Sequence, residues 1–319
     1  EAAAGRPDLL VGGGGVYDTL SLSRAVVPRL PSHRLQSLVR FLDIEGGTAH
    51  RAGDDAMAVG LLFWRLVELL DEMGSAVLGR LSSLAGSPFR ELFEAAAERT
   101  KDRLDPYALP RYGEKEAELL RYDNARSMDI ERTPTPEKLD IDLDAIESLF
   151  HVEGLIGSRL RGYEIRREQL QMLRAVIGVH LLVEAGTGVG KSLAYLVPAI
   201  HFAVLNGERV VVSTNTRNLQ EQLFQKDMPF LSEALDVSWS SALLKGRSNY
   251  LCAQRWRQVL ERGMTTAERA SLLPVVVWEL ETNSGDISEN AAFRGVGYLW
   301  NRISAEAGPC LGQRCPLAD

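Results

Sequence analysis

One stretch of the sequence has the composition and spacing of a phosphate-binding loop. Residues 185–192 read AGTGVGKS, which fits the pattern G-x-x-x-x-G-K-[ST] if alanine replaces the first glycine. Glycines let successive backbone N–H groups converge on a phosphate, the lysine adds a cation near the β- and γ-phosphates, and the serine offers a hydroxyl to Mg²⁺. The residues expected to bind nucleotide are Ala185, Gly186, Thr187, Gly188, Val189, Gly190, Lys191 and Ser192, with Ser192 also a Mg²⁺ ligand.

The residues around this loop predict the elements that position it. An apolar strand at 181–183 precedes the loop and a helix, LAYLVPAIHFAVL, follows it; a second strand, RVVVS, and a second helix, TRNLQEQLFQKDMPFL, come next. Such alternation is typical of an α/β fold with a parallel sheet. An incidental glycine-rich turn is the alternative, and the position between a strand and a helix disfavours it.

Composition and charge limit the possible classes of protein. The chain has 319 residues, a length that allows two modules and a linker. Its content of 45% apolar and 25% charged residues is typical of a chain that folds. A formal charge of −7 excludes binding to nucleic acid through the overall charge, although a local basic groove is compatible with it. No run approaches the roughly 18 apolar residues of a membrane span, and no signal peptide is visible. We expect a cytoplasmic location, no membrane contact and no identifiable protein partner.

The domain organisation follows from changes in composition. Residues 1–73 are expected to form one module, which includes a helix in VGLLFWRLVELL at 59–70 with apolar residues at three- and four-residue steps. Residues 74–157 have a looser composition and are predicted to be a connecting region with a short acidic helix in LDIDLDAIESLF. Residues 158–319 are expected to form the second module.

Polar residues flank the phosphate loop on both sides. Arg166 and Gln169 precede it in GYEIRREQLQM, where a solvated helix face is the commoner explanation. Thr214 and Thr216 follow the second predicted strand, where hydroxyls and a helix N-terminus can hold a backbone phosphate. Capping of that helix explains the same residues, and both roles can hold together.

These segments together resemble a known family. GYEIRREQLQM, EAGTGVGKSLAYLVPA, STNTRNLQEQL and LKGRSNYLC are similar to the DinG/XPD-type superfamily two DNA helicases. The resemblance implies a RecA-like P-loop domain that hydrolyses ATP with Mg²⁺ to move along one DNA strand, typically from 5′ to 3′. It implies that Arg166 and Gln169 sense adenine and that Thr214 and Thr216 contact single-stranded DNA. Val189 stands where many relatives carry threonine.

Three cysteines, Cys252, Cys310 and Cys315, lie in the second module. A C-x4-C pair with one distant cysteine is a weak zinc signal, and three buried thiols explain it as well. The resemblance implies instead that the three thiolates hold a four-iron, four-sulfur cluster in a segment inserted from about residue 246, with a fourth cysteine expected beyond Asp319.

Basic and aromatic residues alternate near the first cysteine. Arg247 and Tyr250, together with Trp256, have the composition of a single-strand groove with stacking platforms. Neighbouring cations extend the pattern at Lys245, Arg255, Arg257 and Arg262. Solvated helix faces and a tryptophan in the core explain these residues equally well.

The first module carries a histidine and an aspartate five residues apart, His50 and Asp55. Such a pair can supply a general base and a metal ligand for phosphodiester hydrolysis, or be a surface coincidence. The segments YDTLSLSR, PSHRL and AHRAGDDA resemble the last third of the DnaQ-like (DEDDh) 3′–5′ exonucleases, which have an RNase H-like fold. This resemblance implies catalytic roles for His50 and Asp55 but none for Asp54 or Asp18. The remaining carboxylates are expected upstream of Glu1.

The sequence therefore predicts an ATP-dependent DNA helicase of the DinG type with an attached 3′–5′ exonuclease, acting on single-stranded or branched DNA in repair or replication. Because the other exonuclease carboxylates are expected upstream of Glu1, we expect these residues alone to be inactive as a nuclease. A DE-x-H box is expected downstream of Asp319, so we expect these residues alone to hydrolyse ATP poorly. The alternatives are an ATP-regulated exonuclease without unwinding, a non-catalytic module that binds ATP or single strands, and, more remotely, a P-loop kinase.

Overall fold

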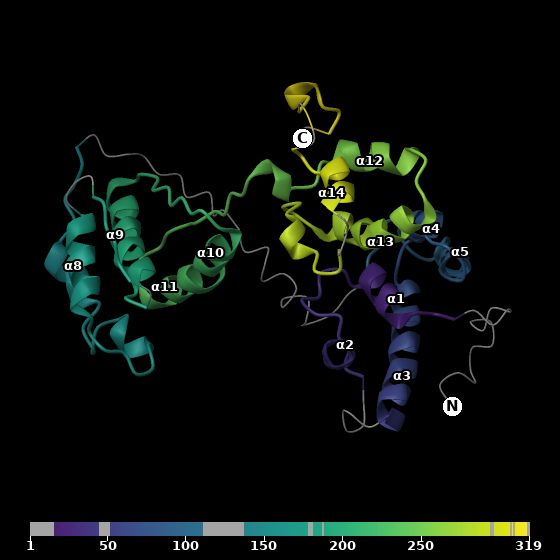
Figure 1. Cartoon of the computed structure of the whole chain (residues 1–319), viewed down its shortest axis with the longest axis horizontal. Coiled ribbons are helices and arrows are strands. Elements are labelled where there is room, and N and C mark those ends of the chain that lie inside the picture. Colours follow the sequence, from purple (N-terminus) through teal and green to yellow (C-terminus); the bar gives the residue numbers. More distant parts are fainter. Residues whose placement is uncertain are drawn as a thin grey trace. The chain divides into compact units, whose positions relative to one another are not determined.

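The computed structural model describes residues 16–44, 52–110, 137–177, 181–186, 188–293, 297–306, 308 and 310–317. The chain divides into two compact units (Figure 1). Unit 1 comprises Glu1–Asp123 together with Gly246–Asp319, and unit 2 comprises Asn124–Lys245.

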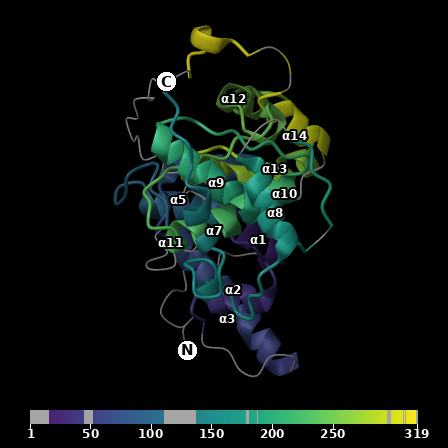
Figure 2. The same ribbon diagram turned by 90° about the vertical axis from the view of Figure 1, so that its left-hand side faces the viewer.

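The N-terminal part of unit 1 is helical. Its helices are α1 (Thr19–Val26), α2 (Leu35–Phe41), α3 (Ala52–Leu70), α4 (Ser75–Leu84) and α5 (Phe89–Thr100). The predicted helix at 59–70 is confirmed as the second half of α3, which extends beyond α1 in both views (Figures 1 and 2). Leu62, Leu66, Leu69 and Leu70 are fully buried on one face of α3, whereas Val59 is 38% exposed.

The C-terminal part of unit 1 is also built from short helices. They are η7 (Arg247–Asn249), α12 (Ala253–Glu261), α13 (Thr266–Glu281), η8 (Ile287–Glu289), α14 (Gly297–Ile303) and η9 (Gly312–Arg314). A capping box starts α13, because Thr265 accepts a hydrogen bond from the Glu268 N–H and Glu268 accepts one from the Thr265 N–H. All residues of α13 from Leu272 to Trp278 are buried.

The two parts of unit 1 share one hydrophobic core. Helix α13 packs against α1 and α4, and Trp256 and Trp278 lie in the same apolar cluster as the buried leucines of α3. Polar contacts join the parts as well: Arg80 pairs with Glu279 at 3.2 Å. Unit 1 is therefore formed from residues far apart in the sequence, which only tertiary packing brings together.

Unit 2 is a second helical body with its own core. It contains α7 (Leu143–Ser148), η5 (Gly157–Arg159), α8 (Arg167–Val176), α9 (Lys191–Asn206), α10 (Arg217–Gln222), the π-helical turn η6 (Leu223–Asp227) and α11 (Met228–Ala234). The predicted helices after the phosphate loop and after Thr216 are confirmed, the latter with a π-helical interruption. Leu173 of α8 and Val197 of α9 are fully buried in this core.

The predicted parallel sheet does not form among the described residues. Residues 181–186 and 209–214, expected as strands, have no regular secondary structure; in the described part of the chain only isolated bridges occur, Tyr250 with Asp286 and Leu251 with Ser304. Leu182 is 98% and Val211 is 87% exposed. A strand is defined by ladder hydrogen bonds to a neighbour, and these segments make none to each other. The architecture is helical, consistent with the helical part of a RecA-like domain.

The predicted connecting region at 74–157 also differs from the structure. Residues 75–100 form α4 and α5, whose apolar residues belong to the core of unit 1. The reason is a helical spacing at Val77, Leu78, Leu81 and Leu84, all buried, that the loose overall composition concealed. Among the described helices, none combines the length and apolar composition needed to cross a membrane.

Candidate nucleotide site and exonuclease motif

The backbone of the phosphate loop turns at two glycines in unit 2. Gly188 and Gly190 both have φ of +82°, a left-handed conformation that disfavours any side chain. Gly190 is also the N-cap of α9, and a Cβ there would lie 2.3 Å from Nε2 of Gln169, whereas a Cβ at Gly188 would meet nothing within 4 Å. Glycine is therefore favoured at position 190 both by the left-handed φ and by the close approach of the Gln169 side chain. The predicted contact at Thr187 lies outside the described residues.

The loop lysine points back into the loop. Nζ of Lys191 donates hydrogen bonds to the carbonyl oxygens of Ala185, at 2.9 Å, and Gly186, at 2.5 Å. The ammonium of Lys191 therefore donates to the backbone of the loop itself, and its contact with phosphate oxygens stays a prediction. Val189 is half-buried beside this arrangement. The residues present fit a nucleotide phosphate tail.

Arg166 and Gln169 are brought to the loop by the start of α8. Arg166, the N-cap of α8, donates through Nη1 to the carbonyl of Gly188, and Nε2 of Gln169 donates to the carbonyl of Gly190 at 2.9 Å. Gln169 is only 2% exposed, so it does not lie on a solvated helix face. Both side chains hold the loop, and their predicted contact with adenine is not tested by this geometry.

A polar cluster joins the start of α9 to the π-helical turn η6. Ser192 and Gln222 lie near the carboxyl group of Asp227, and Ser192 lies near Tyr195. Burial raises the pKa of the Asp227 carboxyl, against the lowering effect of these polar neighbours and of the Lys226 charge. Sequence reasoning missed Asp227, because only the packing of η6 on α9 brings it to Ser192.

The two threonines proposed to contact DNA make local hydrogen bonds. Oγ1 of Thr216 accepts from the N–H of Leu219 at 3.3 Å and caps α10, which confirms the capping role. Oγ1 of Thr214 donates to the carbonyl of Thr216 at 3.4 Å. Thr216 is exposed, so its contact with DNA stays compatible with this geometry and stays a prediction.

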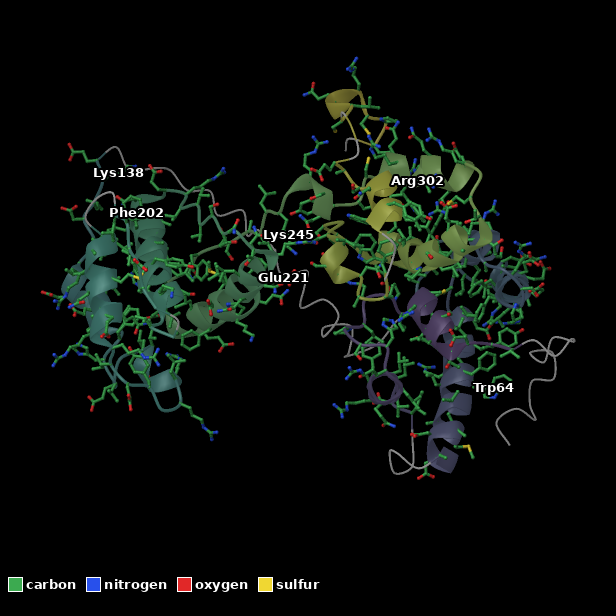
Figure 3. The ribbon with its side chains drawn as sticks, in the orientation of Figure 1. Trp64, Lys138, Phe202, Glu221, Lys245 and Arg302 are labelled. Carbon is green, nitrogen blue, oxygen red and sulfur yellow. The ribbon has the colours of Figure 1, made fainter. Side chains whose placement is uncertain are left out.

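Two residues of the expected basic and aromatic groove are buried instead. Lys245, at the end of unit 2, pairs with Glu221 at 3.1 Å, and its side chain is only 1% exposed (Figure 3). Trp256 is 1% exposed in the core of unit 1. The core explanation therefore holds for Trp256, and neither side chain forms an open platform for a DNA strand.

Two more residues of the expected groove, Arg247 and Tyr250, are not fully buried in unit 1. Arg247 is exposed, and its Nη2 donates to the carbonyl of Ala305 at 2.7 Å. Tyr250 is half-buried and forms an isolated backbone bridge with Asp286. Their predicted contact with DNA is not tested here.

The three cysteines are free thiols in unit 1. Cys252 and Cys315 are half-buried and Cys310 is exposed. Sγ of Cys315 donates to Oε1 of Gln254 at 3.3 Å. Over the described part of the chain, no three His, Cys, Asp or Glu side chains gather closely enough to hold a metal ion. This arrangement of thiols does not by itself fit a four-iron cluster.

Of the predicted exonuclease pair, His50 lies outside the described residues and Asp55 lies in the first turns of α3. Oδ1 of Asp55 accepts from Nε2 of Gln36 at 3.4 Å. Asp18 caps α1 through its side chain, which accepts from the N–H groups of Leu20 and Ser21. Asp55 lines a small open pocket of about 230 Å³ between α2 and α3, together with Gln36, Val39, Arg40, Ile44, Asp54 and Ala58.

The segment that contains the phosphate loop is similar to known proteins. Residues 166–281 match the DEAD/DEAH box helicase family. The chain is 29% identical over 303 residues to the 3′-5′ exonuclease DinG of Bacillus subtilis, an alignment that covers 91% of the chain and 31% of that protein. It is 37% identical over 178 residues to the ATP-dependent DNA helicase YoaA of Haemophilus influenzae, covering 54% of the chain and 27% of the relative.

The similarity to YoaA extends to the Escherichia coli protein, at 35% identity over 175 residues, 53% of the chain and 27% of the relative. The chain thus spans about a third or less of the length of these relatives. No solved structure matches the chain significantly. The resemblance predicted from the motifs is confirmed at the level of the helicase domain: residues 166–281, which include the phosphate loop, match the DEAD/DEAH box helicase family, and DinG and YoaA proteins align with the chain.

Proposed function

We propose that this chain belongs to an ATP-dependent DNA helicase of the DinG type that carries a 3′–5′ exonuclease module. The observation that carries the proposal is the phosphate loop, in which Lys191 lies inside a turn made by two left-handed glycines. This loop falls within the residues that match the DEAD/DEAH box helicase family. Relatives named helicase or exonuclease align with the chain, which supports both activities.

In this proposal the loop residues bind and orient a triphosphate. The carbonyl contacts of Lys191 give way to β- and γ-phosphate oxygens, while Gln169 keeps its hydrogen bond to Gly190 and so maintains the turn. The N-terminus of α9 adds its positive end to the same charge. Mg²⁺, held by the Ser192 hydroxyl, would neutralise charge on the phosphates.

The polynucleotide contact is assigned to the end of the second predicted strand and the start of α10. Thr214 and Thr216 lie there, and Thr216 leaves the N-terminus of α10 capped but open to solvent. In unit 1, Arg247 is an exposed cation that could contact a phosphate. Single-stranded or branched DNA is the proposed substrate, and the names of the relatives support DNA as the partner.

Strand displacement by the full protein tests the motor. With a fluorescent forked duplex and Mg·ATP, the wild type should separate the strands and Lys191→Ala should not. Glu208→Gln, at the far end of α9, is the matched control and should keep activity. Nucleotide release without displacement by the wild type would support the ATP-regulated exonuclease, and DNA binding without ATP turnover would support the non-catalytic module.

The exonuclease module rests on Asp55 and the pocket beside it. DinG proteins named as 3′-5′ exonucleases align with 86–91% of the chain, whereas the YoaA helicases align with 53–54%. Asp55→Asn should abolish release of 3′ nucleotides by the full protein and leave strand displacement unchanged. Glu68→Gln, on the same helix and away from the pocket, is the control. Unchanged nuclease activity in Asp55→Asn would contradict the assignment.

The iron–sulfur cluster stays a prediction from the motif. Its support is the occurrence of all three thiols in the second part of unit 1, which begins at Gly246. Iron and acid-labile sulfide, measured after anaerobic purification of the full protein, test it directly. Cys310→Ser should remove both if the cluster exists, and an iron-free protein with wild-type DNA binding would refute it.

A further inference from the structure

The connector between α1 and α2 lies inside unit 1. All residues from Ala25 to Leu30 are buried, and Arg29 among them is only 6% exposed. Connectors usually run over the protein surface, because a buried connector must find partners for its backbone N–H and C=O groups. An arginine is almost never fully buried unless it is paired. The partners of this connector therefore indicate what holds it in place.

The C-terminal part of unit 1 supplies these partners. Nη1 of Arg29 donates to the carbonyl of Glu281, the last residue of α13, at 3.2 Å. The N–H of Ala292 donates to the carbonyl of Pro28, also at 3.2 Å. The connector is therefore bound at both ends of one loop, residues 282–291, which lies far away in the sequence.

The loop that binds the connector is itself fixed by buried polar side chains. Glu289, 5% exposed, accepts a hydrogen bond from Oγ1 of Thr282 at 2.5 Å. Asn290, 3% exposed, donates through Nδ2 to the carbonyl of Pro274 in α13 at 3.0 Å. Buried polar side chains whose hydrogen bonds are made rigidify the segment that carries them. The loop therefore presents the N–H of Ala292 to the connector from a fixed position.

The connector leads into the helix that lines the Asp55 pocket. Helix α2 begins at Leu35, shortly after Arg29, and its N-cap residue Arg34 makes no side-chain capping hydrogen bond. Gln36 of α2 lines the pocket together with Asp55 of α3, and its Nε2 donates to Oδ1 of Asp55 at 3.4 Å. Because α2 has no side-chain cap of its own, its position depends on the connector and on its packing against α3.

We propose that Arg29 is a positioning residue for the exonuclease site: its hydrogen bond to the end of α13 holds the connector and thereby sets the position at which α2 presents Gln36 to Asp55. The inference rests on the proposed nuclease role of Asp55. Helix α13 lies within the residues that match the helicase family, whereas α2 and α3 belong to the module that resembles exonucleases. The nuclease site therefore depends on residues of the helicase domain.

Exonuclease kinetics and amide hydrogen exchange of the full protein test the inference together. Arg29→Met removes the donor and keeps a long side chain. It should speed exchange in peptides of α2 and lower kcat for release of 3′ nucleotides about 10- to 100-fold, with KM for single-stranded DNA within about 2-fold, since a misplacement of about 1 Å can cost about 100-fold in rate. Arg29→Lys keeps a donor for the Glu281 carbonyl and should restore most of kcat. Arg34→Met, at an exposed arginine closer to α2, is the matched control and should behave as the wild type.

A change on the other side of the contact tests the same coupling. Asn290→Ala loosens the loop that carries Ala292, so it should also speed exchange in α2 and lower kcat. Combined with Arg29→Met, its effect should be smaller than in the wild type, because both variants act through one contact. If Arg29→Met does not fold, which faster exchange in every peptide would reveal, Arg29→Gln takes its place.

The outcomes separate this inference from the proposed function. A wild type that releases no 3′ nucleotides refutes the proposed exonuclease itself. If the wild type is active but Arg29→Met keeps its kcat, changes only KM, or leaves exchange in α2 unchanged, the positioning role is wrong. Losses of kcat that multiply independently in Arg29→Met and Asn290→Ala would also overturn it.

Discussion

Replacing Gly190 with alanine should destabilise unit 2 more than the same change at Gly188. The two glycines have the same φ, +82°, so each alanine pays the same conformational cost of about 1–2 kcal/mol. They differ in what the new Cβ meets: nothing within 4 Å at Gly188, but Nε2 of Gln169 at 2.3 Å at Gly190. Gly188→Ala is therefore a control for backbone strain alone.

The extra cost at Gly190 follows from the side chain that must move. Gln169 is 2% exposed and donates to the Gly190 carbonyl at 2.9 Å, so displacing it breaks that bond and leaves buried polar groups unpaired. Such a loss amounts to about 1–3 kcal/mol. With a urea dependence of about 1–3 kcal/mol per molar, the unfolding midpoint of Gly190→Ala should lie about 1 M below that of Gly188→Ala.

Urea unfolding monitored by amide hydrogen exchange in peptides from α8 and α9 measures this difference in unit 2. Combining Gly190→Ala with Gln169→Ala removes the clashing atoms, so the double variant should be more stable than the sum of the single effects by about 1 kcal/mol or more. Equal midpoints for the two glycine variants, or strict additivity in the double variant, would refute the contact between Gln169 and the loop.

Further variants test unit 2 in other ways. Lys191→Ala should weaken Mg·ATP binding about 10- to 100-fold in a fluorescence titration, since it removes a charged donor; unchanged affinity would contradict the site. Arg174 pairs with Glu147 through bonds of 2.7 and 2.9 Å, and Glu147 is 8% exposed; Arg174→Met, which leaves that carboxylate unpaired, should therefore lower the free energy of unfolding by about 1–3 kcal/mol, more than Glu147→Gln does. Burial lowers the pKa of His201, so the unfolded chain binds its proton more strongly; stability should fall as the pH drops below the ordinary value of 6.5, and less steeply in His201→Leu, as urea titrations between pH 7.5 and 5.5 would show.

The sequence predicts local structure and the phosphate loop well. Helices α3 and α9 follow from apolar spacing, and the loop follows from its glycines, its lysine and its place before a helix. Gln169 has no such signal: its burial against Gly190 depends on how α8 packs on α9. Asp227 is hidden for the same reason, since a π-turn changes the face that the residue presents.

Long-range packing accounts for the other differences. The apolar segments at 181–183 and 210–212 have strand composition, but strand pairing depends on neighbours that composition does not identify. Trp256 and Lys245 have the residue types of a nucleic-acid groove, but Trp256 lies in the core of unit 1 and the buried Lys245 side chain pairs with Glu221, and no local pattern encodes either environment. Residue type alone therefore does not identify a groove residue where tertiary packing buries its side chain.

The division of unit 1 between the two ends of the chain has a consequence for the order of synthesis. Helices α1 and α4 pack on α13, which begins about 165 residues after α5 ends. At roughly 5–20 residues per second, a ribosome needs on the order of ten to thirty seconds to add that length. During this interval the apolar faces of α1 and α4 that pack on α13 lack this partner. Unit 2, whose residues are contiguous in the sequence, can fold during the same interval. Unit 2, although its synthesis starts later, can therefore complete its fold before unit 1 does.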